Sequence, residues 1–452
     1  MTTDLEPVTR PAGDSARPWS TAQLFAFRVL CCVGGLILVL GVLGSLILAP
    51  VMDPVKAPFG RIGAFLSGTE YAAPKIGGTG DTLSIWQYHG GAVAVGLVLA
   101  VAWWYFDRRR TDYRALAGLL WEVSRFALAM GMIFYGIAKL IPTQMGMMDL
   151  PTYALQPAGD ISRMNMLWGF MGASDGYSMV TGLVETVSGL LLLSRRTWIV
   201  GALGAIVSMA QVVLMDTFYN VPVKFLAFEF LVIAIAILAP VWPNLVNAAL
   251  GRPAGAQPRL WRPAGADRTW LRRTGKTVAA LGIAVMLFGS VALGALGYAS
   301  TQEARSPVDG TWHATSFTVD GREAVASGTV AAQGAPGALP WVNVAITYRG
   351  KGGVEAMADD FTTLVTQTPS AAITAWHLEV GDDALTIRQR ESDPPIRLDY
   401  RQEAPDRLAL SGTVDGHAVR AEYERRPMAR ASEGLRFTHQ EPDEQLPVPD
   451  FP

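Results

Sequence analysis

Half of the 452 residues are apolar, 17% are charged and the mean hydropathy is +0.26. These values exclude an ordinary soluble protein and predict a polytopic membrane protein. The overall charge of −2 hides an asymmetry, because residues 300–452 hold 14 Arg and Lys against 23 Asp and Glu. The two cysteines are adjacent at Cys31 and Cys32, which excludes a disulfide framework and the spacing of a zinc site. We therefore predict no metal site, and no feature indicates a nucleic-acid partner.

Seven stretches are apolar over about 20 residues, the length that crosses roughly 30 Å of hydrocarbon. A polar tail at residues 1–27 precedes the first of them. They include an amino-terminal hairpin within 28–106, whose external loop is 51–86. The predicted spans are 28–50, 87–106, 117–141, 174–194, 197–217, 222–241 and 276–299.

Basic residues predict the orientation, because cytoplasmic loops are enriched in Arg and Lys. They gather before the first span, at Arg108–Arg110, at Arg195–Arg196 and in the loop 242–275, and all four positions fall on one side. We therefore predict a cytoplasmic amino terminus, a bacterial inner-membrane location and an extracytoplasmic region after residue 299.

A glycine-rich stretch at residues 75–81 reads Lys-Ile-Gly-Gly-Thr-Gly-Asp. It lacks the Gly-Lys-Ser/Thr ending of a phosphate-binding loop and no strand precedes it. We interpret it as a turn in the external loop.

Residues 300–428 alternate between apolar and polar side chains, which predicts antiparallel strands joined by turns such as Asp320-Gly321 and Asp415-Gly416. About eight to ten short strands favour a closed barrel or a sandwich. Gly310-Thr311-Trp312 resembles the Gly-x-Trp opening of lipocalin-like barrels, which we use for shape alone. Residues 429–452 are acidic and Pro-rich and are not expected to fold.

Small residues recur on one face of the fourth and fifth spans. In membranes such stripes let helix backbones approach closely, so we interpret them as packing positions. Near the inner end of the third span, Glu122 and Arg125 are three residues apart and predict a local ion pair. The two faces with small residues carry Ser178, Gly182, Glu185 and Gly189 in the fourth span, and Gly201, Gly204, Ser208 and Gln211 in the fifth.

Charged residues inside apolar spans need partners, because an isolated charge in hydrocarbon costs at least a few kcal/mol. Glu185 lies about ten residues into its span, roughly 15 Å deep, so it is protonated, paired or facing water. Lys139, Asp216 and Lys224 lie at outer ends of spans, as does His89. We expect Lys139 or Lys224 to pair with Asp216, or to reach inward to Glu185 or Glu229. Lys224 and Glu229 are five apart and are not expected to pair with each other. The structural alternative is that these groups only fix helix register or snorkel to headgroups.

Residues 117–241 carry four motifs: Tyr-Gly-x-x-Lys-x-x-Pro-x-Gln from Tyr135, Trp-Gly-Phe-Met-Gly-Ala-Ser from Trp168, Gly-x-x-Glu-x-x-x-Gly-Leu-Leu-Leu from Gly182, and Asn-Val-Pro-Val-Lys from Asn220. With these motifs the segment resembles the DoxX family of bacterial four-helix membrane proteins. The resemblance implies an inner-membrane bundle, in some members associated with thiosulfate:quinone or thiol redox systems. It also implies functional roles for Lys139, Gln144, Glu185 and Lys224. The first two spans, the seventh span at 276–299 and the β domain depart from that pattern.

Two functions follow. The first is a non-catalytic scaffold, or a subunit that binds a small lipophile and presents the β domain to an envelope protein. The alternative is a redox-associated subunit that binds a quinone, and no catalytic residue is assigned in either case. The candidate polar pocket comprises Tyr135, Lys139, Gln144, Glu185, Asp216, Lys224 and Glu229.

Overall fold

The computed structural model describes residues 18–46, 49–73, 80–145, 150–256, 261, 268–302, 304–326, 329–330, 339–349 and 362–427. The predictions for the tail 1–17, for the glycine-rich stretch 75–79, for most of 257–267 and for the acidic tail 429–452 lie outside these ranges. The chain divides into two compact units, one formed by Met1–Leu140 with Val180–Val291 and the other by Ile141–Met179 with Ala292–Pro452. Each unit is described by itself.

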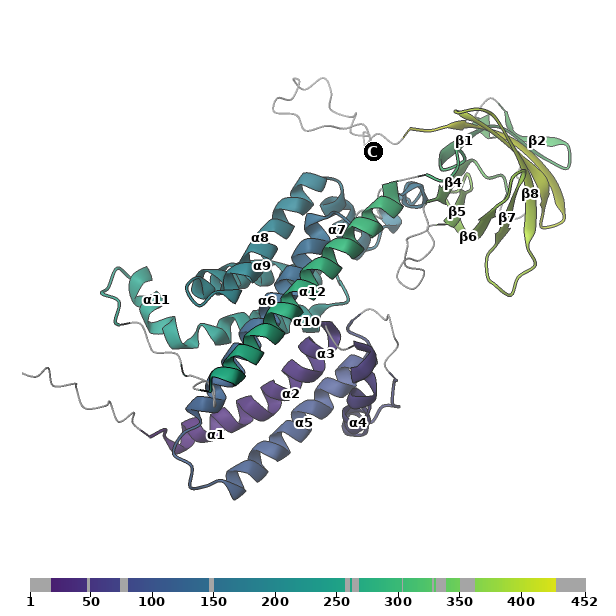
Figure 1. Ribbon diagram of the computed structural model, residues 1–452. Coiled ribbons are helices and arrows are strands. Elements are labelled where there is room, and N and C mark those ends of the chain that lie inside the picture. Colours follow the sequence, from purple (N-terminus) through teal and green to yellow (C-terminus); the bar gives the residue numbers. More distant parts are fainter. Residues whose placement is uncertain are drawn as a thin grey trace, which may run out of the picture. The chain divides into compact units, whose positions relative to one another are not determined.

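Helices make up the described part of the chain as far as residue 302 (Figure 1). The first three helices, α1 to α3, are joined end to end by two π-helical segments, η1 and η2. The helices are α1 (Thr21–Val29), η1 (Leu30–Gly34), α2 (Gly35–Ile37), η2 (Leu38–Leu43), α3 (Gly44–Leu46), α4 (Ala49–Ser67), α5 (Leu83–Phe106), α6 (Arg114–Leu140), η4 (Pro151–Tyr153), η5 (Ala158–Asp160), α7 (Arg163–Gly172), α8 (Asp175–Leu193), α9 (Trp198–Phe218), α10 (Lys224–Ile237), η6 (Ala239–Val241), α11 (Trp242–Ala249) and α12 (Thr269–Gln302).

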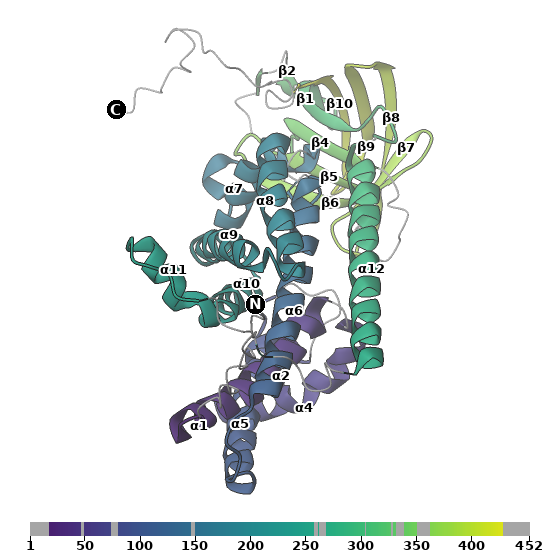
Figure 2. The same ribbon diagram turned by 60° about the vertical axis from the view of Figure 1, so that its left-hand side comes forward.

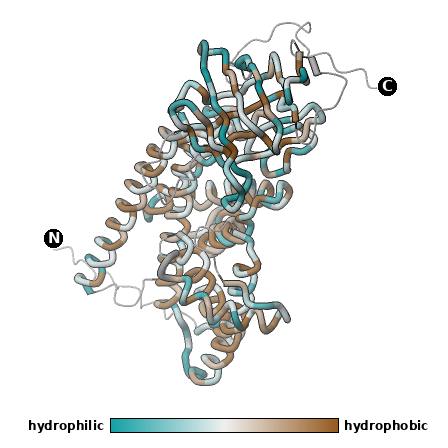
Figure 3. The backbone as a smooth tube through the Cα atoms, turned by 90° about the vertical axis from the view of Figure 1, so that its right-hand side faces the viewer, coloured by the Kyte–Doolittle hydropathy of each residue, from teal (hydrophilic) through white to brown (hydrophobic). Residues whose placement is uncertain are grey.

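Seven helical segments among the described residues are long and apolar enough to cross a bilayer, which confirms the predicted number. Many large apolar side chains of these helices are exposed, among them Val285 and Phe288 of α12, and the tube of α12 in Figure 3 carries much of the brown that marks apolar residues. Such a surface is suited to lipid, where burial of apolar side chains brings no gain from leaving water. The spans are Thr21–Leu43, Leu83–Phe106, Arg114–Leu140, Asp175–Leu193, Trp198–Phe218, Lys224–Ala249 and Thr269–Ala299.

An additional helix, α4, lies where the sequence predicted only a loop between the first two spans. It contains Pro54, Pro58 and several charged residues, and in a sequence this composition is typical of a loop. The helix packs closely on α5 (Figure 2). At the crossing, Gly63 meets the backbone of Gln87 and Gly91 meets that of Phe59, with no room for a Cβ atom at either glycine. Tertiary packing therefore supports a helix that local propensity disfavours.

The glycines of the two small-residue stripes lie at helix crossings, which confirms their interpretation as packing positions. A Cβ on Gly189 would lie 2.9 Å from the carbonyl oxygen of Ala129 in α6, and one on Gly182 would lie 2.5 Å from that of Gly136. A Cβ on Gly201 of α9 would lie 2.8 Å from the Ser188 carbonyl in α8. Bulkier residues at these points would force α6, α8 and α9 apart.

The second unit contains a closed antiparallel barrel. Eight strands among the described residues form the ring β1-β4-β5-β6-β7-β8-β9-β10, which closes by pairing of β10 with β1. The short hairpin β2-β3 pairs with the second half of β1, beyond the point where β4 leaves it. The strands are β1 (Gly310–Val319), β2 (Arg322–Ala326), β3 (Thr329–Val330), β4 (Asn343–Tyr348), β5 (Thr362–Gln367), β6 (Ile373–Val380), β7 (Ala384–Arg388), β8 (Ile396–Ala404), β9 (Arg407–Val414) and β10 (His417–Arg425).

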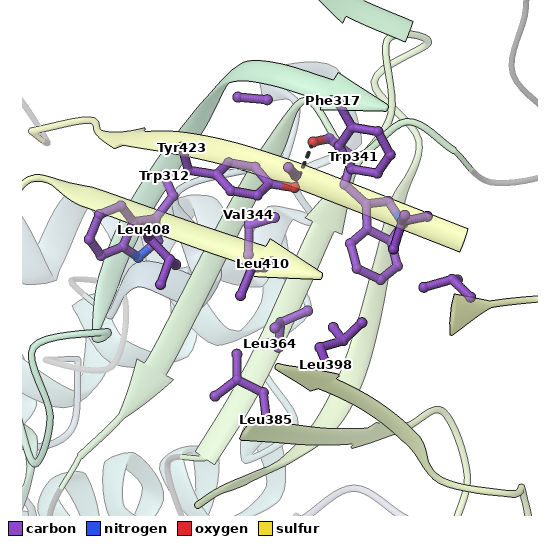
Figure 4. Close-up of a cluster of buried hydrophobic side chains, with 14 of the residues drawn as sticks. Trp312, Phe317, Trp341, Val344, Leu364, Leu385, Leu398, Leu408, Leu410 and Tyr423 are labelled. Atoms are coloured by element: carbon purple, nitrogen blue, oxygen red, sulfur yellow. Dashed lines mark hydrogen bonds between the residues drawn. The ribbon is translucent and has the colours of Figure 1, made fainter. Parts of the chain in front are cut away.

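Large side chains fill the interior of this barrel (Figure 4). Trp312 is fully buried, and Tyr423 donates a hydrogen bond of 3.1 Å to the carbonyl oxygen of Trp341. The guanidinium of Arg425 lies over the Trp312 ring, 4.3 Å from its centroid, and donates to the Asp309 carbonyl at 2.8 Å. Gly310 has a φ of +143° and lies against Arg425, so both its backbone and the space around it require glycine.

The connection between α6 and α8 packs on the outer face of β4 and β5. The Thr152 amide donates to the Thr347 hydroxyl at 3.0 Å, and the Gln367 side chain donates to the Leu155 carbonyl at 2.8 Å. Leu155 is buried against Ala345 and Val365. The inner and outer faces of both strands are therefore covered, whereas β6 and β8 show the alternating burial of strands with one free face.

The carboxyl end of α12 is attached directly to the barrel. The guanidinium of Arg349 donates to the Thr301 carbonyl at 2.6 Å and forms an ion pair of 3.1 Å with Asp309, while the Arg305 amide donates to the Tyr348 carbonyl at 2.9 Å. A planar guanidinium that holds two partners at once restricts the orientation of both. The barrel thus follows α12 through a structured junction.

Candidate functional site

Lys139 and Glu185 form a buried ion pair between α6 and α8. The Lys139 ammonium nitrogen lies 2.8 Å from each carboxylate oxygen of Glu185. The side chains are only 7% and 5% exposed. The close approach of α6 and α8 at Gly136 and Gly182 lets the lysine, in the last turn of α6, reach a carboxylate well inside α8. The sequence required Glu185 to be protonated, paired or facing water, and the structure gives it a cationic partner.

Asp216, near the end of α9, is a buried carboxylate with one oxygen atom that makes no hydrogen bond to the described part of the chain. Its residue is 5% exposed, and Oδ2 has no hydrogen-bond partner among the residues that the structure describes. Asp216 interacts electrostatically with Lys139 and Glu185, and with the phenol of Tyr135 on α6. The arrangement is a closed ion pair beside one carboxylate oxygen that can still accept a hydrogen bond.

Lys224 pairs with Asp81, which precedes α5 and was not among the predicted site residues. The Lys224 ammonium lies 3.4 Å from Asp81 Oδ2, and the backbone amides of Lys224 and Phe225 donate to the same carboxylate at 2.9 and 3.2 Å. Asp81 thus caps the amino end of α10, where free amides and the helix dipole favour an anion. No sequence signal identified this pair, because Asp81 lies in a loop 143 residues away.

Glu229 lies one and a half turns further along α10 and contacts His89 of α5. The distance between His89 Nε2 and Glu229 Oε1 is 2.6 Å. The other ring nitrogen, Nδ1, lies 2.8 Å from the carbonyl oxygen of Ile85. The polar glutamine, tyrosine and histidine at positions 87–89 of an apolar span are the signal that marks this position in the sequence.

The structure therefore divides the seven predicted pocket residues. Tyr135, Lys139, Glu185 and Asp216 share one neighbourhood within the first unit. Asp216 also interacts electrostatically with Lys224, which is paired with Asp81, and Glu229 pairs elsewhere with His89. Gln144 belongs to the second unit, where its backbone carbonyl accepts a hydrogen bond of 3.1 Å from the indole of Trp168, and its side-chain Oε1 has no hydrogen-bond partner among the described residues.

Three of the pairing predictions have clear outcomes. Lys139 pairs with Glu185, which was one of the expected alternatives, whereas Lys224 pairs with Asp81 instead of Asp216. The prediction of a local pair between Glu122 and Arg125 is confirmed at 2.6 Å, and Arg195 also contacts Glu122. Residues three apart on a helix can be paired from sequence, whereas partners on separate helices depend on how the helices cross.

These features define the class: a helical membrane protein that carries a carboxyl-terminal closed β barrel. Comparison of the chain with protein-family models, with curated proteins and with solved structures gave no match. Among the described residues, no group of three or more His, Cys, Asp or Glu side chains is placed to hold a metal ion.

Proposed function

We propose that the protein is a non-catalytic membrane subunit that binds a small lipophile, whose polar head donates a hydrogen bond to Asp216. The observation that carries this proposal is the Oδ2 atom of this buried aspartate, which has no hydrogen-bond partner within the described ranges. Leaving a buried acceptor unsatisfied costs about 1–3 kcal/mol, and more when the group is charged. A ligand hydroxyl or amine removes that penalty.

The neighbouring pair explains why the head would bind at Asp216. The Lys139 ammonium lies at 2.8 Å from both oxygens of Glu185, so these two groups satisfy each other. Asp216 is held near them without joining the pair. The head group therefore meets an acceptor, while the apolar surface of the spans is compatible with a hydrocarbon tail.

On the resemblance to the DoxX family, α6, α8, α9 and α10 form a four-helix bundle in a bacterial inner membrane. We propose a cytoplasmic amino terminus and an extracytoplasmic β domain, because the basic clusters fall on one side. The packing of Thr152 and Leu155 on the barrel supports this topology. This contact requires the loop between α6 and α8 to lie on the same side of the membrane as the barrel. The two lie on one side because four spans, an even number, separate them in the sequence. A reporter fused after Pro427 that is active only in the cytoplasm would contradict the orientation.

The β domain serves, in this proposal, to bind an envelope protein through its outer surface. Its interior is filled by side chains such as Trp312, Phe317 and Tyr423, each at most 2% exposed. A small ligand inside the barrel would have to displace this core. The loop on β4 and β5 leaves other strands free for a partner.

The test is mass spectrometry of lipophiles that co-purify with the full-length protein. Wild type should retain one species above the background of bulk lipid, and Asp216→Leu should lower its occupancy about tenfold or more, the equivalent of one hydrogen bond to a charged group. Glu122→Gln is a matched control, since it alters a paired carboxylate of α6 that does not interact with Asp216. Equal occupancy in wild type and Asp216→Leu would refute the proposal.

The second candidate function is a redox-associated subunit, and the same carboxylate supports it. Asp216 Oδ2 accepts a hydrogen bond, and a quinol carries hydroxyl groups that can donate one. Quinols therefore belong to the proposed ligand class. Any electrons would then pass to or from a partner protein. An absorbance change on addition of menaquinol to the purified protein, lost in Asp216→Leu, would favour this candidate over the scaffold.

A further inference from the structure

His89 and Glu229 form a second polar pair within the first unit, separate from the Lys139–Glu185 neighbourhood. Both side chains are 10% exposed, and they join α5 to α10. Asp216 of α9 interacts electrostatically with Lys139, Glu185, Asp81 and Lys224, whereas Glu229 interacts with Lys56 and Tyr88. The two sets of charged groups are thus distinct.

The hydrogen bonds at His89 determine how many protons the pair holds. A carbonyl oxygen only accepts, so the contact of 2.8 Å between Nδ1 and the Ile85 carbonyl requires a proton on Nδ1. The neutral ring then carries a lone pair on Nε2. Glu229 Oε1 lies 2.6 Å from that nitrogen, and two lone pairs cannot meet at this distance. One proton must therefore lie between them, bound to either the imidazole or the carboxyl group.

The surroundings confine this proton. The Phe225 ring stacks on the imidazole at a centroid distance of 4.6 Å. From the π-helical segment η2, Gly41 faces the carboxylate, and a Cβ there would lie 2.8 Å from Glu229 Oε1. π-Helical segments occur frequently at functional sites, and in this one Gly41, which has no side chain, lets the helix backbone approach the carboxylate directly.

The charged and titratable neighbours can be assigned element by element. The helix α4 contributes Lys56, which forms an ion pair of 3.8 Å with Asp53 and interacts with Glu229. The helix α5 contributes Tyr88, whose ring lies 5.4 Å from the Lys56 ammonium. The segment η2 has no ionisable residue, whereas η1 carries Cys31 and Cys32. On α10 itself Lys224 is paired with Asp81, and α6 and α9 contribute Tyr135, Lys139 and Asp216 of the other neighbourhood.

We propose that His89 and Glu229 form a proton-binding site in the membrane part of the protein, with one proton bound between Nε2 and Oε1. The ligand of this site is the proton itself, which lies within hydrogen-bond distance of both Nε2 and Oε1. The site gives a role to α1–α5, which lie outside the segment that resembles four-helix proteins. It is independent of the lipophile bound at Asp216.

The test is a pH titration of the histidine ring nitrogens by NMR, with full-length protein labelled with ¹⁵N-histidine in nanodiscs. The chain has five histidines, and the His89 signal is the one lost in His89→Asn. In wild type this signal should report one titration. In Glu229→Gln its midpoint should fall by at least one pH unit, a tenfold weaker affinity for the proton.

A matched control separates proton binding from loosening of the helices. Lys224→Met removes the neighbouring contact between the same two helix regions, and it should leave the His89 midpoint unchanged. Glu229→Asp keeps a carboxylate and provides a second variant if Glu229→Gln does not fold. A wild-type His89 signal that does not change with pH would overturn the proposal. So would a midpoint that is equal in wild type and Glu229→Gln, or one that shifts as far in Lys224→Met.

Discussion

The helical region and the barrel place charge and apolar surface in opposite ways. Lys139 and Glu185 lie buried between helices, while Phe288 on α12 is 79% exposed. In the barrel, Trp312 is fully buried, and Arg397 and Asp383 pair at the surface with 65% and 81% of their side chains exposed. The surrounding medium explains the difference. Lipid accepts apolar side chains but no charge, whereas water accepts charge and drives apolar groups inward.

The largest expected effect comes from breaking the buried pair in the helices. Lys139→Met leaves the Glu185 carboxylate buried without its cation, which costs about 3–5 kcal/mol. Unfolding by SDS in mixed micelles measures this loss. The double variant Lys139→Met with Glu185→Leu should recover most of the stability, because two apolar residues replace a pair that had to be desolvated. A double variant as unstable as the single one would show that the charges themselves stabilise the bundle.

The next effect concerns the barrel, at the contact between Arg425 and Trp312. Arg425→Ala removes the cation–π contact and the guanidinium hydrogen bonds to the Asp309 and Pro405 carbonyls. We expect a loss of about 2–3 kcal/mol, measured by the thermal transition of the barrel with circular dichroism in the full chain. Arg425→Lys should recover only part of it, since an ammonium cannot hold carbonyls in a planar fork. Full recovery of stability with lysine would show that Arg425 acts through its positive charge alone.

A much smaller effect should follow from the surface pair of Arg397 with Asp383, which lie 3.3 Å apart. Exposed pairs contribute about 0–1 kcal/mol, so Arg397→Ala should change the stability of the barrel by less than about 0.5 kcal/mol. The same thermal measurement applies. A loss comparable with that of Arg425→Ala would contradict the contrast between buried and exposed charge.

The smallest effect is a pH dependence at the barrel surface. A hydrogen bond from the His417 ring at 2.7 Å lowers the pKa of Asp320 below its ordinary value of 3.8. Because the folded pKa is depressed, the stabilisation is present above the unfolded value and is lost as pH falls through the folded one. Asp320→Asn should therefore flatten the acid limb of the stability profile of the barrel. An unchanged acid limb would exclude this contribution.

Parts of the candidate site could be predicted from the sequence. The depth of Glu185 within an apolar span required a partner, and Glu122 with Arg125 followed from their spacing on one helix. The partners of Lys224 and Glu229 could not be predicted in the same way, since Asp81 and His89 lie 143 and 140 residues away. Their pairing depends on how α5 packs beside α10.

The sequence by itself determined the number of spans and the carboxyl-terminal β domain. Both depend on local periodicity, about 20 apolar residues to cross a bilayer and a period of two in strands. Tertiary structure decided the rest. The packing of Gly63 on α5 stabilises α4 as a helix in spite of Pro54 and Pro58. A loop distant in sequence covers the outer face of β4 and β5. Tertiary structure also left Asp216 Oδ2 without a hydrogen-bond partner among the residues that the structure describes. Each of these outcomes depends on contacts between residues far apart in the chain, which no local pattern encodes.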